Sequence, residues 1–369
     1  MSSISSNRIP SLDGLRAISI LLVIASHAAF LFGFSSFYNV GDLGVRVFFA
    51  ISGFLITGLL IRELDKTDKI NLVKFYFRRT LRIFPPYYFF LLIFVLLAVA
   101  GKVQISLAQF LPVFTYTSNY IFPGDWNLDH AWSLSVEEQF YVIYPGFLVL
   151  FGRRTIEWLL GLSLLICPIV RFADFHVFSH LQPIWITKGF HANLDTLAIG
   201  CLLALKHKSL HENRLYRQML SSKFMFAVPV LLVAVNAQID YAGLNLGLLF
   251  SLNNILIALT IDWAVTHHAN VAGKILNSRP FVFIGMMSYS IYLWQQPFLL
   301  NLGAFVDRYL NPDLSSKHFA FPYSLFAFAL CCGVSYFVVE KYSLKLRNYG
   351  EKVFFARRPK LINPKPVGA

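Results

Sequence analysis

Hydrophobic residues in this chain are gathered into blocks of about 17–22 residues, the length that a helix needs to cross a bilayer, and short polar links separate the blocks. Ten blocks can be assigned along the sequence, at residues 14–34, 43–61, 84–100, 135–151, 156–172, 190–206, 224–240, 244–265, 280–300 and 319–339. The pattern predicts an all-α, polytopic membrane bundle of about ten transmembrane helices.

Composition supports this class and excludes an ordinary soluble domain. Of the 369 residues, 56% are hydrophobic and 14% are charged, whereas about a quarter of the residues in a soluble domain are charged. We expect residues 1–340 to form the membrane bundle. We expect the basic segment 341–369 to be a cytoplasmic tail that is disordered or lies on the membrane surface.

Positive charge is shared unequally between the two sides of the predicted bundle. If both termini are cytoplasmic, 25 of the 32 Lys and Arg residues lie in cytoplasmic tails and links, and five, including Arg171, lie in outer links. This bias predicts cytoplasmic termini and an even number of spans. It also accounts for most of the net charge of +13, so we expect membrane lipids and not nucleic acid as partners of the basic surface.

Arg16 and His27 both lie in the first block. Ionisable side chains are costly inside a bilayer, so such positions are candidates for function. Eleven residues make about three helical turns, which places both side chains on one helix face at a separation of roughly 16 Å along the axis. The alternative is an arginine that reaches the interface and a histidine that hydrogen-bonds to a neighbouring helix.

Arg78, Arg79 and Arg82, here named the arginine link, lie in the segment KFYFRRTLRIFPP between the second and third blocks. Guanidinium groups among aromatic rings suit phosphates beside a ring that can stack, so coenzyme A fits this chemistry. An anchor for lipid phosphates is the alternative.

Glu137 and Glu138 lie at the start of the fourth block. Adjacent acids point in different directions, so we expect one of them to face the bundle and orient or charge a histidine, as in general acid–base catalysis. Acids that only complement the helix dipole are the alternative.

Further polar residues in the blocks are candidates for substrate binding. Arg46 lies at the outer end of the second block, Asp195 in the sixth, and Tyr289 and Tyr292 in the ninth. Asp195 can also be a buried structural partner. Ser52 and Gly53 indicate a close approach of two helices. The pairs His207/His211 and His267/His268 are interpreted as surface pairs, and no metal is expected.

Six segments occur in an order that resembles a known family: RIPSLDGLRAISILLVIASH, GVRVFFAISGFLIT, FYFRRTLRIFPPYY, WSLSVEEQFYVIYP, LDTLAIGCLLA and SYSIYLWQQP. Over roughly residues 8–340 the chain resembles the acyltransferase-3 family of integral membrane acyltransferases, which includes O-antigen, Nod-factor and peptidoglycan acetylases. The resemblance implies transfer of an acyl group, usually acetyl from acetyl-CoA, to a hydroxyl of a glycan or lipid-linked saccharide at the bacterial cytoplasmic membrane. Lipopolysaccharide is among the acceptors that it suggests, and a homodimer is one of the oligomeric states left open.

The resemblance also assigns candidate residues. The family's motifs fall on Arg16, His27, Ser52, Gly53, Phe54, Arg78, Arg79, Arg82, Trp132 and Glu137. Trp132 joins the candidates for substrate binding on this ground. Family members often have a histidine in the ninth block where this chain has Gln295, which removes a possible second base.

Together these interpretations predict an acyl-transfer path. Acyl-CoA phosphates bind the arginine link and Arg16, His27 acts as general base on the acceptor hydroxyl, and Glu137 orients His27 from the outer side. A variant has His27, Tyr289 or Tyr292 carrying the acyl group transiently. The alternative function is a proton-coupled transporter or flippase of a lipid-linked sugar that uses Arg16, His27 and Asp195.

Overall fold

The computed structural model describes the chain except for residues 1–8, 32–38, 182–184, 239–242, 306–322 and 356–369. Its described part contains helices joined by loops and has no strand, which confirms the all-α class. The α-helices are α1 (Pro10–Leu31), α2 (Asn39–Thr67), α3 (Leu72–Val99), α4 (Leu107–Phe114), α5 (Trp126–Asp129), α6 (Ala131–Phe178), α7 (Trp185–Lys188), α8 (Phe190–Glu212), α9 (Arg214–Ser221), α10 (Val228–Ala237), α11 (Gly243–Thr266), α12 (Val271–Leu276), α13 (Arg279–Phe305), α14 (Tyr323–Val334) and α15 (Lys341–Phe354). Short 3₁₀ helices cover Ser179–Leu181 (η2) and Lys223–Phe226 (η3), and a π-helical turn covers Ser335–Glu340 (η5).

Six helices in the described residues are long and apolar enough to cross a membrane. They are Pro10–Ala28, Asn39–Thr67, Leu72–Val99, Trp126–Leu181, Leu246–Thr266 and Leu325–Phe354. The fourth contains Gly152 with φ 73° and ψ 168°, a non-helical conformation that falls in the link between the predicted blocks 135–151 and 156–172. The multi-helix membrane architecture is therefore supported, whereas the count of ten spans and the cytoplasmic termini remain predictions.

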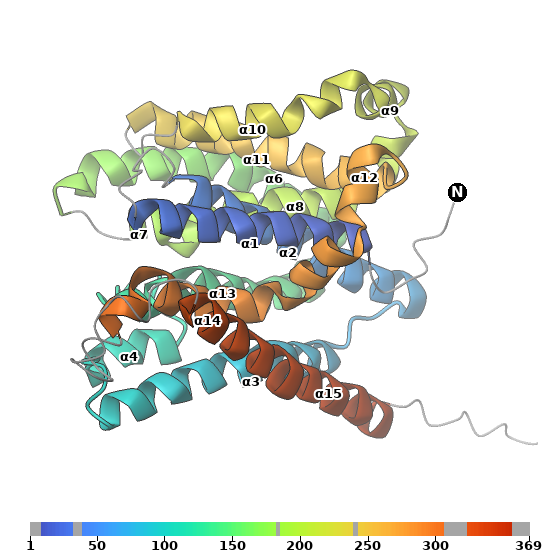
Figure 1. Cartoon of the computed structure of the whole chain (residues 1–369). Helices are drawn as coiled ribbons and strands as arrows, with labels where there is room; N and C mark the ends of the chain where they lie inside the picture. The colour runs from blue at the N-terminus through green and yellow to red at the C-terminus, as the bar shows by residue number, and fades with distance from the viewer. Residues whose placement is uncertain (1–8, 32–38, 182–184, 239–242, 306–322, 356–369) are drawn as a thin grey trace, which may run out of the picture.

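Helices α1, α8, α10 and α11 run roughly parallel in Figure 1, whereas α3 and the α14–α15 segment are inclined to them. Helix α1 packs against α2 and α13, and α2 packs against α8. In Figure 1, α10 and α11 lie on one side of this central group, and α3, α14 and α15 lie on the other. Helices α9 and α12 lie toward one end of the bundle, and α4 and α7 lie toward the opposite end.

Two glycines allow α2 and α8 to approach closely. A Cβ atom on Gly53 would lie 2.2 Å from the carbonyl oxygen of Leu197, and one on Gly200 would lie 2.0 Å from that of Ala50. Neither position has room for a side chain. The close approach predicted from Ser52 and Gly53 is confirmed, and small residues of this kind are typical of membrane helix interfaces.

The C-terminal segment continues from α14 through η5 into α15. Helix α15 packs against α3, and Gly350 lies against the ring of Phe77. Of the two alternatives predicted for the tail, disorder does not apply to Lys341–Phe354, which are helical, and a position on the membrane surface stays a prediction. Residues 356–369 of the predicted tail lie outside the described residues.

Candidate functional site

Three cavities lie along α2. The central cavity has a volume of about 110 Å³. Its polar lining includes Arg16, Ser52, Arg79, Arg82, Glu137, Glu138, Tyr141, Tyr289, Tyr292 and Glu340. The structure thus brings Arg16, Glu137, Tyr289, Tyr292 and two members of the arginine link together, although they come from α1, α6, α13 and α3.

Charged and polar groups in the central cavity form a connected set. Ser52 Oγ donates to Glu137 Oε1 at 2.6 Å, and Tyr141 OH donates to Ser52 Oγ at 3.0 Å. The Arg79 guanidinium lies over the Tyr141 ring at 5.4 Å. Glu137 is therefore held by a hydroxyl pair in a cavity that also contains cationic groups.

A second cavity, the basic cavity, is lined by Lys74, Arg78, Arg79, Arg82, Arg347 and Glu351 among others. Arg78 Nε donates to Glu351 Oε1 at 2.7 Å, and its Nη2 makes a second contact with the same carboxylate. Arg79 and Arg82 line both the basic and the central cavity. The arginine link is thus divided between Arg78, which pairs with Glu351 of α15, and two arginines that line both cavities.

His27 lies in a third cavity, the histidine cavity, which Asp42, Trp126, Asp129, His130, Trp132, Lys188 and Gln296 also line. His27 Nδ1 lies 2.7 Å from Gln295 Oε1, and its ring meets the Trp126 ring edge-on at 5.6 Å. Because the amide oxygen can only accept, Nδ1 carries the proton in this contact and Nε2 keeps its lone pair. A neutral imidazole in this tautomer can act as a base through Nε2.

The structure gives His27 a different partner from the one expected. Glu137 bonds to Ser52 and lines the central cavity, whereas Gln295 bonds to His27. The expectation that Glu137 orients His27 does not match this arrangement. Gln295, interpreted from the sequence as the loss of a base, is the hydrogen-bond partner of His27, because α13 packs against α1.

Tyr292 and Val45 line both the histidine cavity and the central cavity, so the two cavities are neighbours. The Tyr292 hydroxyl lies 2.5 Å from Ser133 Oγ and 3.0 Å from the carbonyl oxygen of His130. Helix α2 follows all three cavities, from Asp42 at the histidine cavity to Lys66 at the basic cavity. At about 1.5 Å per residue this is roughly 36 Å, close to the thickness of a bilayer.

Sequence reasoning missed several groups of the histidine cavity. Lys188, from the short helix α7, lies over the Trp132 ring at 5.4 Å. Burial lowers the pKa of Lys188, and the nearby charges of Asp42 and Asp129 oppose that shift. His130 is buried, and its ring nitrogens make no hydrogen bond among the described residues. Both residues lie in links between the predicted blocks, where polar residues are ordinary and do not indicate a functional site.

Asp195 and Arg46 lie away from these cavities. Asp195 Oδ1 and Oδ2 accept from Arg171 at 3.0 and 2.8 Å, and both side chains are buried. The charge count assigned Arg171 to an outer link, whereas the structure buries it in an ion pair with Asp195. Arg46 contacts Asn236 and stacks on the Phe250 ring at 4.2 Å. These contacts suit structural roles, since a buried charge requires a partner.

A family model described as an acyltransferase domain, acyltransferase-3, matches residues 9–339 of the chain. A peptidoglycan O-acetyltransferase OatA of Listeria monocytogenes is 30% identical over 346 residues, covering 83% of this chain and 51% of the relative. An O-acetyltransferase OatA of Staphylococcus aureus is 28% identical over 372 residues, covering 94% and 58%. A putative peptidoglycan O-acetyltransferase YrhL of Bacillus subtilis is 30% identical over 329 residues, covering 82% and 50%.

The chain thus spans about half the length of the curated relatives it matches. No solved structure matches it.

Proposed function

The chain belongs to the acyltransferase-3 family, and we propose that it moves an acetyl group from cytoplasmic acetyl-CoA to a hydroxyl of a cell-surface or exported glycan. Peptidoglycan is the first acceptor to test, because relatives carry that substrate in their names. The observation that carries the proposal is the series of neighbouring cavities: Arg79 and Arg82 line both the basic and the central cavity, and Tyr292 lines both the central and the histidine cavity.

The basic cavity is the proposed site for the donor's phosphates. Arg79 and Arg82 line its boundary with the central cavity, and Lys74 adds an ammonium group. Guanidinium groups bind phosphates through paired hydrogen bonds. A donor bound there has its acyl arm directed toward the central cavity, where Arg16 provides a further cation.

His27 is the proposed general base. Its Nε2 takes the proton of the acceptor hydroxyl as the oxygen attacks the thioester carbonyl carbon, and the thiolate of coenzyme A leaves. Gln295 acts on the reaction through His27 by fixing the tautomer and ring orientation. Glu137 is a positioning residue in this scheme, since it balances the cationic groups of the central cavity and holds Ser52. Tyr289 and Tyr292 are the tyrosines placed to contact the acyl group or acceptor.

A proton-coupled transporter or flippase is not favoured. That alternative used Asp195 as a relay group together with Arg16 and His27, but Asp195 is engaged by Arg171 away from the three cavities. A transporter also has no need of the arginines that join the basic and central cavities.

Transfer of label from acetyl-CoA tests the proposal. Purified protein in lipid vesicles is supplied with labelled acetyl-CoA and peptidoglycan fragments or other glycans. We expect labelled glycan with the wild type, and a loss of at least 100-fold with His27→Ala, in the range that general-base catalysis contributes. His176→Ala, an exposed histidine on α6, serves as the matched control. Unchanged transfer by His27→Ala would overturn the catalytic assignment, and a wild type that neither binds acetyl-CoA nor labels any glycan would overturn the proposed function.

A further inference from the structure

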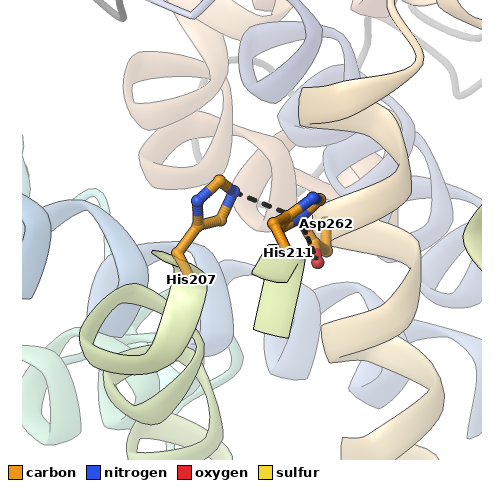
Figure 2. Close-up of side chains that lie close together, drawn as sticks. All are labelled: His207, His211 and Asp262. Carbon is orange, nitrogen blue, oxygen red and sulfur yellow. Dashed lines mark hydrogen bonds and ion pairs between the residues drawn. The ribbon is translucent and has the colours of Figure 1, made fainter. Parts of the chain in front are cut away.

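His207 and His211 of α8 and Asp262 of α11 form a cluster apart from the three cavities, here named the His–His–Asp cluster. Figure 2 shows both imidazoles projecting from one helix toward the carboxylate. We interpreted the two histidines from sequence as a surface pair without a metal. In the structure they are about one-quarter exposed, at 26% and 24%, and Asp262 is fully buried.

The ligand atoms of the His–His–Asp cluster converge. Asp262 Oδ1 lies 3.3 Å from His207 Nε2 and 3.0 Å from His211 Nε2, and all three ligand atoms lie within 4.8 Å of one another. In tetrahedral zinc sites the bonds are about 2.0–2.1 Å, so neighbouring ligand atoms lie roughly 3.3–3.4 Å apart. The observed N–O distances are close to that spacing.

Helix geometry and hydrogen bonding both support a bound cation. Residues four apart project from one helix face, and the two rings stack with centroids 4.5 Å apart. Both Nε2 atoms face one carboxylate oxygen: His211 Nε2 lies within hydrogen-bond distance of Asp262 Oδ1, and His207 Nε2 forms an ion pair with the same oxygen at 3.3 Å. A cation placed between the three groups would be coordinated by both Nε2 lone pairs and by the buried carboxylate together.

A supporting residue holds the carboxylate in place. Tyr216 OH donates to Asp262 Oδ2 at 2.5 Å. The other carboxylate oxygen, Oδ1, is the one that faces His207. Outer partners of this kind orient metal-binding carboxylates. They are expected at a built metal site and are not needed for a solvated histidine pair.

We propose that the His–His–Asp cluster binds one divalent transition-metal ion of the zinc class, through Nε2 of His207 and His211 and the carboxylate of Asp262. Two imidazoles and a carboxylate suit such an ion better than Mg²⁺ or Ca²⁺, which prefer oxygen ligands. The metal ties α8 to α11 and, through Tyr216, to α9. Because α8 packs closely on α2, which lines the central cavity, the metal stabilises the scaffold of the site without taking part in the chemistry.

Zinc uptake by tag-free protein in detergent tests the site. After dialysis against micromolar Zn²⁺ and a desalting step, we expect one zinc per chain in the wild type and in the control His268→Ala, an exposed histidine at the same end of the bundle. His207→Ala and His211→Ala should each weaken binding by at least tenfold, and Tyr216→Phe by about tenfold. Co²⁺ in place of Zn²⁺ should give the intense visible absorption of a four-coordinate site.

The wild-type protein alone keeps the test decisive if the variants fail to fold. Zn²⁺ should raise its melting temperature and a chelator should reverse the rise, because a ligand that binds only the folded state stabilises it. Absence of zinc from the dialysed wild type, or equal uptake by a folded His207→Ala variant, would overturn the proposal. Neither result bears on glycan acetylation, which the label-transfer experiment tests separately.

Discussion

The partner of His27 determines which of its nitrogens can accept a proton. Gln295 Oε1 accepts from Nδ1 at 2.7 Å, so Nε2 is the free basic atom. We expect Gln295→Leu to lower the turnover number for acetyl transfer by roughly 10–100-fold, since removal of an orienting partner commonly has an effect of that size. The Michaelis constant for acetyl-CoA should be unchanged, because the basic cavity is untouched.

Steady-state rates at varied acetyl-CoA concentration measure both the turnover number and the Michaelis constant for acetyl-CoA. Gln296→Leu is a poor control because Gln296 also lines the histidine cavity. Gln218→Leu is the better control, because this glutamine lies on the short helix α9, which is distant in sequence from α1 and α13. A Gln295→Leu enzyme with wild-type turnover would show that the contact does not orient the base.

The three residues of the arginine link are not equivalent. Arg79 lines both the basic and the central cavity, whereas Arg78 is already paired with Glu351. We expect Arg79→Ala to raise the Michaelis constant for acetyl-CoA by roughly 10-fold or more, as loss of a charged hydrogen bond costs about 1.5–3 kcal/mol. Arg78→Ala should have a smaller effect, with Arg217→Ala, exposed on α9, as the control.

Titration calorimetry gives an independent measure of the affinity of the Arg79→Ala and Arg78→Ala variants for acetyl-CoA. If Arg78→Ala weakened donor binding as much as Arg79→Ala does, the two arginines would hold equivalent positions, and the division of the arginine link inferred from the cavities would be incorrect.

Residue positions were predictable from sequence only where the bilayer makes a side chain costly. Arg16 and His27 were identified as candidates for function because they interrupt an apolar block, and the arginine link was identified because it is a dense cationic segment. The contact between His27 and Gln295 joins residues 268 positions apart, so no local pattern could reveal it. Lys188 and His130 lie in links, where polar residues are ordinary, and only the fold places them beside His27.

At the scale of helices, the α2–α8 contact depends on glycine. We expect Gly53→Ala to destabilise the folded protein by about 1–3 kcal/mol, because its Cβ would lie 2.2 Å from a backbone oxygen that cannot move aside cheaply. Gly58→Ala is the matched control on the same helix, since nothing lies within 4 Å of its Cβ position. Thermal unfolding in detergent should show a lower melting temperature for Gly53→Ala than for Gly58→Ala, and equal melting temperatures would contradict the packing argument.

Helix boundaries show where sequence patterns are and are not sufficient. The apolar blocks located the long helices because a bilayer requires continuous apolar length. The pattern could not predict that Lys341–Phe354 form a helix, because that segment is rich in charge and its contacts are with α3. The π-helical turn at Ser335–Glu340 also had no sequence signal, although it places Glu340 within reach of Ser290 Oγ at 3.0 Å.

For the whole molecule, the order of the cavities along α2 suggests a direction for the proposed transfer. The basic cavity and the histidine cavity lie at opposite ends of a helix segment of roughly bilayer length. This arrangement agrees with the charge bias, which predicts a cytoplasmic location for the arginine link. We therefore expect donor and acceptor to approach from opposite sides of the membrane.

Sealed vesicles of defined orientation test this prediction. Acetyl-CoA cannot cross the bilayer, so it should support transfer when added to inside-out vesicles and should fail with right-side-out vesicles until they are permeabilised. Cysteines introduced at Asp65 in α2 and at Ile121 before α5, both exposed, report the orientation of the same protein. A membrane-impermeant maleimide should label Asp65→Cys only in inside-out vesicles and Ile121→Cys only in right-side-out vesicles. Labelling of both from one side would contradict the proposed topology, and donor use from the outer side would reverse the direction of the path.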